Sequence, residues 1–238
     1  MSTLSTFIYP TITALSVLAP DWIAIILDPV INYMQTKAWT QDYVIHDISK
    51  GWLFLSSSNS PEILLMPRVV YPNTVGVTDP ETAILGNTGS FFFMVYAYQK
   101  LTGDKTWAQE YAALFEKYAD YLINNGLYPF SQLDTVDFIP ATANQTNLAI
   151  VSTIGLNAYG AVTGNETDTQ VAQKLANEIY TNGLGTDQPG SSATHFTYNY
   201  HDAISWGTLF NLFPDQWLGL NTFQRRQSSC NADGAPSS

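Results

Sequence analysis

A duplicated segment most constrains what this chain of 238 residues can fold into. Residues 97–104 read AYQKLTGD and residues 158–165 read AYGAVTGN, an offset of 61 residues. Each copy is followed by a capping-box pattern, which begins at Thr106 or Thr167, and later by Asn-Gly-Leu, a typical end of a helix. The duplication therefore predicts a repeated pair of helices.

The two helices of each predicted pair differ in polarity. Residues 91–98 and 148–162 are apolar on nearly every side, which is typical of buried helices. The segments 107–121 and 171–179 place their apolar side chains on one face only. This alternation predicts an inner and an outer ring of helices. We expect an all-α fold, a partial α/α toroid of about six helices, with a simple helical solenoid as the alternative.

Two more helices are expected outside the duplicated pairs. One runs from Asp21 to about Lys37. The other is apolar, starts near Ser205, and reaches Pro214, because a proline stops or kinks a helix.

Short and long connections alternate along the chain. The turns from inner to outer helices are short, whereas the connections at 46–87, 127–147 and 183–205 are long and polar. Long connections on one side of a fold often carry function. We expect them to meet at the N-terminal ends of the inner helices, where backbone N–H groups and helix dipoles face the opening.

Charge and composition exclude several classes of partner. Nine basic against 20 acidic residues give a net charge of −11, which argues against nucleic acids and anionic membrane surfaces. The apolar stretch at 7–31 is too interrupted by Pro and Asp for a membrane span. No basic residue precedes Lys37, so no signal peptide is expected. The single cysteine, Cys230, excludes a multi-cysteine metal site, and no cofactor motif is present.

Three carboxylates from separate long connections are the candidate catalytic groups: Asp47, Asp137 and Asp202. Carboxylates that meet in one opening can act as general acid and general base on a bound water if their environments separate their pKa values. Such chemistry suits hydrolysis of an amide or a glycosidic bond. For each carboxylate taken alone, capping of a helix or a turn is the structural alternative.

Polar and aromatic side chains of the same connections are the candidate substrate-binding groups: His46, Asn144, Gln145, Asn147 and Trp206. Each also has a structural interpretation, as a core histidine, a cap or a core aromatic. His195 and His201 match no metal-binding spacing, so we expect neither a metal nor a cofactor.

Several ordered motifs of the chain resemble the central region of the fungal glutaminase A family. They are YVIHDI at 43–48, YPN at 71–73, YADYL at 118–122, ANQTNLAI at 143–150 and SWG at 205–207. The resemblance spans about residues 7–223, so we expect one domain over 1–223 followed by a disordered tail at 224–238.

The resemblance implies a secreted enzyme that hydrolyses glutamine to glutamate and ammonia. It also implies a catalytic domain similar to the six-hairpin glycosidase toroids. On this interpretation Asp137 is the general base, Asp47 or Asp202 is its partner, and His46 orients them. The remaining candidates hold the small-molecule substrate.

The chain also departs from the family. Gly86 and Asn87 stand where the family has an acidic pair, and residues 49–70 form an atypical insertion or a translated intron. The family continues beyond Leu220, so we expect a fragment that associates with itself through the exposed helices of an incomplete ring. A catalytically inactive binding or scaffold domain is therefore a second hypothesis. A glycan-acting hydrolase is a third, on fold analogy alone.

Overall fold

The computed structural model describes residues 9–46, 83–134, 140–207 and 209–223 of the chain, so the predicted insertion at 49–70 and tail at 224–238 lie outside it. The described part is all-α, as expected. Its elements are α1 (Tyr9–Leu18), α2 (Trp22–Met34), α3 (Ile84–Thr102), α4 (Thr106–Gln109), α5 (Ala112–Asn125), α6 (Thr146–Thr163), α7 (Glu166–Ile179), a 3₁₀ turn (Gly190–Ser192) and α8 (Leu212–Trp217). None of these helices is long and apolar enough to cross a bilayer.

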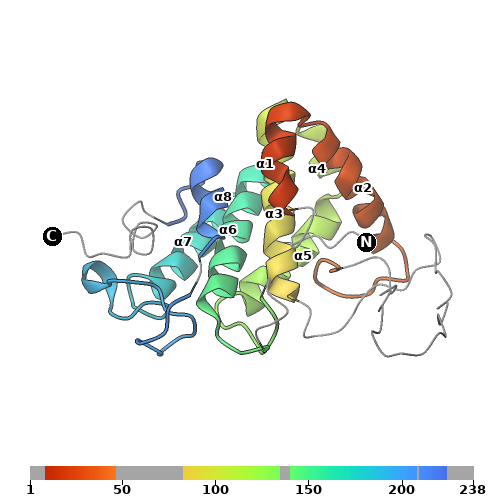
Figure 1. Ribbon diagram of the computed structural model, residues 1–238. Helices are drawn as coiled ribbons and strands as arrows, with labels where there is room; N and C mark the ends of the chain where they lie inside the picture. The colour runs from red at the N-terminus through yellow and green to blue at the C-terminus, as the bar shows by residue number, and fades with distance from the viewer. Residues whose placement is uncertain (1–8, 47–82, 135–139, 208, 224–238) are drawn as a thin grey trace, which may run out of the picture.

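The two inner helices, α3 and α6, pack against each other at the centre of the molecule (Figure 1). Most of their residues are buried, including polar ones, as the all-round apolar pattern predicts. Their backbones touch at a pair of glycines: a Cβ atom on Gly155 would lie 2.6 Å from the Cα of Gly89. A side chain at either position would separate the helices, so this crossing requires glycine.

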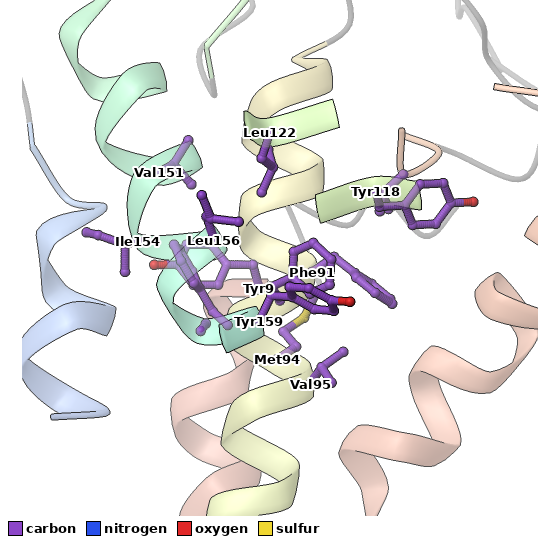
Figure 2. Packing of buried hydrophobic residues seen from close by; sticks show 14 of the residues in the cluster. Tyr9, Phe91, Met94, Val95, Tyr118, Leu122, Val151, Ile154, Leu156 and Tyr159 are labelled. Carbon is purple, nitrogen blue, oxygen red and sulfur yellow. The ribbon is translucent and has the colours of Figure 1, made fainter. Parts of the chain in front are cut away.

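The outer helices cover the inner pair with one apolar face each. Aromatic rings join α3 to α5 and α6: Phe91 lies 5.2 Å from Phe115, and Phe92 lies 5.1 Å from Tyr159, between ring centroids. Figure 2 shows side chains of several helices meeting in this core. On the other side of α3, Tyr9 of α1 contacts Phe93. The helix α1 was not expected from the sequence.

The duplication is visible in the backbone. Both inner helices end at a glycine in the left-handed region, Gly103 with φ 76° and Gly164 with φ 73°. The N–H of each glycine donates to the carbonyl four residues earlier, at Gln99 and at Gly160. These two turns are therefore equivalent structures at the predicted offset, and the expected repeat is confirmed.

The predicted capping boxes are wrong in detail. In the first turn, Asp104 Oδ1 accepts a hydrogen bond from the backbone N–H of Thr106 at 2.8 Å. In the second, Asn165 Oδ1 accepts from the N–H of Thr167 at 3.0 Å. The capping side chains thus lie two residues before the threonines, because Asp and Asn form the tighter local turn.

The predicted helix from Ser205 is also wrong. The helix α8 begins only at Leu212, and Pro214 lies in its first turn, where a proline costs little because the first N–H groups have no partner within the helix. Trp206 is 58% exposed and belongs to the preceding connection. The predicted outer helix at 107–121 is divided into α4 and α5.

Candidate functional site

Two of the three long connections, 127–147 and 183–205, meet at the N-terminal ends of the inner helices, as predicted, whereas most of the connection at 46–87 lies outside the described residues. The N–H of Thr146, the first residue of α6, donates to the carbonyl of Tyr198 at 2.9 Å, and the N–H of Tyr200 donates to Asn144 at 3.0 Å. The hydroxyl of Tyr200 donates to the carbonyl of Leu127 at 2.6 Å. We call this region the loop face: the first turns of α3 and α6 with residues 127–134, 140–145 and 198–200 (Figure 1).

The N-terminal end of α3 is held by hydrogen bonds with two distant segments. Ala83, which precedes it, has φ 35° and provides no side-chain cap. Instead, Gln132 Oε1 accepts from the N–H of Leu85 at 2.9 Å, and the N–H of Val44 donates to Thr88 Oγ1 at 3.1 Å. Gln132 is therefore a tertiary cap for an inner helix, and Val44 contacts the same end of that helix.

Side-chain amides dominate the centre of the loop face. Gln145 Nε2 donates to the carbonyls of Gln132 and Thr142, at 2.7 and 3.0 Å. Asn147 Nδ2 donates to Asp134 Oδ2 at 2.7 Å. Gln132, Gln145 and Asn147 are at most 4% exposed. The loop face thus holds a carboxylate, Asp134, against a buried layer of amides.

The structure brings together three of the predicted substrate-binding residues. Gln145 and Asn147 are buried at the start of α6, and Asn144 lies beside them, exposed, with φ 58°. His46 is half-buried. Sequence reasoning did not select Gln132 or Asp134 as site residues, because no local motif shows that a loop amide caps a distant helix.

The structure does not test whether the three predicted carboxylates lie together. Asp47 and Asp137 lie outside the described residues, so their roles stay predictions. Asp202 is exposed on the connection that follows the loop face, two residues after Tyr200. Within the described residues, no group of three or more His, Cys, Asp or Glu side chains could hold a metal ion.

Trp206 instead covers a histidine. Its ring stacks on that of His195 at 3.8 Å between centroids and 5° between planes. His195 is 6% exposed, with Nδ1 2.9 Å from Thr194 Oγ1 and 3.7 Å from Asp187. Burial raises the pKa of the Asp187 carboxyl, but hydrogen bonds from Thr194 and from the N–H of His195 outweigh it and lower the pKa below its usual value. This cluster organises the connection before α8.

A hollow of about 500 Å³ lies elsewhere, on the outer surface of α5. Asp42, Glu116, Lys117 and Asp120 are among its lining residues, and Lys117 pairs with Asp42 at 3.0 Å. None of the predicted site residues that the structure describes lines this hollow. We therefore place the candidate site at the loop face.

The two positions where the resemblance implies an acidic pair in the family also lie at this end of the fold. Gly86 and Asn87 belong to the first turn of α3 and are buried. A Cβ on Gly86 would lie 3.8 Å from Leu148 of α6, which is ordinary contact. Gly86 therefore lies at the packed boundary between the inner helices, and Asn87 is buried next to it in the chain.

Comparison with known proteins agrees with this architecture. The sequence model described as "Glutaminase A six helical-hairpin domain" matches residues 1–232. The chain belongs to this family. The match extends over the whole helical part, which includes both repeated pairs and the loop face.

Two fungal relatives have similar sequences. Glutaminase A of Aspergillus oryzae is 28% identical over 211 residues, which cover 85% of this chain and 27% of the relative. A protein of Arthroderma benhamiae named "Probable glutaminase" is 25% identical over 262 residues, which cover 89% of this chain and 29% of the relative. The chain thus spans less than a third of the length of these relatives. No solved structure matches it.

Proposed function

We propose that this chain acts as a glutaminase-like hydrolase, which converts L-glutamine to L-glutamate and ammonia. The observation that supports the proposal best is the contact between Asp134 and Asn147 at the start of α6, in a chain of the glutaminase A six-hairpin family. That contact places a carboxylate beside amides and a helix N-terminus. Glutaminase activity is named for the two longer relatives, and here it is our proposal.

The chemistry needs a base, a site for negative charge and a proton for the leaving group. A carboxylate takes a proton from water, and the water oxygen bonds to the carboxamide carbon of glutamine. The carbon–nitrogen bond then breaks as that proton passes to the leaving nitrogen, which departs as ammonia. The negative charge that develops on the carbonyl oxygen is stabilised by N–H donors and by the positive end of a helix dipole.

Two assignments of the base follow. Asp137 is the general base that the sequence analysis favours, with Asp47 or Asp202 as its partner and His46 as the orienting group. Asp134 is the alternative that the described geometry supports, because Asn147 holds one of its carboxylate oxygens at 2.7 Å. In either case Asn144, Gln145 and Trp206 are proposed to contact the substrate. The resemblance to a family of secreted enzymes also supports an extracellular location for this activity.

The test is ammonia release from L-glutamine by the purified, folded chain between acidic and neutral pH. We expect turnover, and a loss of at least about 100-fold in kcat for the variant of whichever residue is the base, Asp134→Asn or Asp137→Asn. Asp120→Asn, on the exposed face of α5, is the matched control and keeps full activity. A folded chain without turnover would refute the proposal.

A second candidate is an inactive domain that binds substrate without hydrolysing it. What supports it is that Gly86 and Asn87 stand where the resemblance implies an acidic pair in the family. Calorimetric binding of glutamine by a chain that releases no ammonia would support this function. Turnover by the same chain would exclude it.

A further inference from the structure

Three buried amides at the loop face each bond through one atom and leave the other without a partner. Within the part of the chain that the structure describes, Gln132 Nε2, Gln145 Oε1 and Asn147 Oδ1 have no hydrogen-bond partner. Their residues are 0%, 1% and 4% exposed. Buried polar atoms are nearly always hydrogen-bonded in folded proteins, so three such atoms around the start of one helix require an explanation.

The orientation of all three amides follows from the chemistry of their partners. Gln132 faces the N–H of Leu85, so the atom at that contact is its oxygen. Gln145 contacts two backbone carbonyls and Asn147 contacts a carboxylate, so the atoms at those contacts are nitrogens. A flip of any amide would place donor against donor or acceptor against acceptor. The unused atoms are therefore one donor group and two acceptors.

The three residues lie close together at the N-terminus of an 18-residue helix. Gln145 is the residue before α6 and donates directly to the carbonyl of Gln132, while Asn147 lies in the first turn of the same helix. Asp134 and Thr142, which bond to these amides, are only partly buried. The three amides thus lie one layer beneath the surface of the loop face.

One donor and two acceptors complement a primary carboxamide, which presents one carbonyl acceptor and two N–H donors. An ionised carboxylate presents acceptors only. It could not donate a hydrogen bond to Gln145 Oε1 or Asn147 Oδ1, and its negative oxygen would face theirs. We propose that Gln132, Gln145 and Asn147 form a subsite that binds the side-chain carboxamide of the substrate. The proposal rests on the proposed glutaminase function and adds a residue, Gln132, that determines preference for amide over acid.

The assignment has a consequence for the reaction. The carboxamide of glutamine is held through both its oxygen and its nitrogen, whereas the carboxylate of glutamate loses the donors that satisfy Gln145 and Asn147. The subsite therefore discriminates substrate from product, and the product leaves more readily than the substrate. Gln132 is a specificity residue in this scheme, because its free Nε2 donates to the carbonyl oxygen of the amide.

Isothermal titration calorimetry tests the proposal with four probes: L-glutamine, L-glutamate, propionamide and propionate. We expect the unvaried chain to bind each amide at least tenfold more tightly than the corresponding acid. Gln132→Glu keeps an oxygen for the N–H of Leu85 and replaces the free NH₂ with a second oxygen, so glutamine affinity falls at least tenfold. Gln188→Glu, an exposed residue of another connection, is the control and changes neither affinity.

Each outcome has one meaning. Equal affinity for amides and acids in the unvaried chain, or no binding of either amide, overturns the subsite even if Gln132→Glu does not fold. A folded Gln132→Glu that melts earlier but keeps the amide preference shows a structural amide only. Amide-selective binding without ammonia release would support the subsite and refute the proposed hydrolysis, whereas turnover with a KM unchanged by Gln132→Glu would do the reverse.

Discussion

The contact between the inner helices makes a sharp prediction about Gly155. A Cβ at this position would lie 2.6 Å from the Cα and 2.9 Å from the carbonyl oxygen of Gly89. Favourable carbon–carbon contacts lie at about 3.5–4.0 Å, so the two helices must separate by about 1 Å. Neither glycine can yield by rotating a side chain, because the atoms in contact belong to the backbone.

The expected free-energy change of Gly155→Ala is the difference of two effects. Alanine favours the interior of a helix over glycine by about 1 kcal/mol. Overpacking of a core contact costs about 1–3 kcal/mol, and we expect the upper end because backbone meets backbone. The net destabilisation is about 2 kcal/mol, which lowers Tm by about 4–8 °C for a chain of this size.

The assay is urea unfolding followed by circular dichroism, with Gly86→Ala as the matched control. Gly86 is also buried in α3 and faces α6, but its Cβ would lie 3.8 Å from Leu148 and from Ala83. We expect the control to be neutral or to gain up to about 1 kcal/mol. A Gly155→Ala variant with an unchanged or higher urea midpoint at constant m-value would refute the backbone contact between α3 and α6.

Three further predictions concern the turns, the pH dependence and the surface. Asp104→Ala and Asn165→Ala each remove a cap. In chemical denaturation, Asn165→Ala lowers the free energy of unfolding by about 1 kcal/mol, and Asp104→Ala lowers it further because its carboxylate also accepts from the hydroxyls of Tyr98 and Thr106, so equal losses would contradict this. Because the folded pKa of Asp187 is lowered, its stabilisation is present above the unfolded carboxyl pKa of about 3.9 and is lost as the pH falls through the folded value. The stability difference between the unvaried chain and Asp187→Asn should therefore shrink between pH 6 and about pH 3, and a constant difference would contradict this. Trp22 and Ile25 are 58% and 61% exposed on α2, so we expect concentration-dependent association in sedimentation velocity, weakened in the Trp22→Glu, Ile25→Glu variant, whereas a monomer at all concentrations would oppose it.

Several contacts of the candidate site could not be predicted from the sequence, for a physical reason. Gln145 and Asn147 were selected from the sequence as residues of the long connections, but their bonding depends on Asp134 and Gln132 in another segment. The contact between Gln132 and Leu85 joins residues 47 apart in the chain. No periodicity within either segment encodes such a contact, and only packing of the folded chain decides it.

The segment from Trp206 to α8 shows the opposite case, in which a local pattern predicted a helix that the structure does not form. Aromatic residues at helical spacing predicted a helix from Ser205, yet stacking of Trp206 on buried His195 holds that segment in an irregular conformation. A favourable tertiary contact of two rings can outweigh a weak local helix preference.

The sequence alone determined the local features of this protein. The duplication, the glycines that end α3 and α6, and the distinction between buried and one-sided helices depend on residues within a few positions of one another, where geometry follows from spacing. Only the tertiary structure decided how the helix beginnings are satisfied, by Gln132 for α3 and by the Tyr198 carbonyl for α6. A helix N-terminus leaves N–H groups that its own residues cannot bond, so its partners come from whichever segment the fold places there.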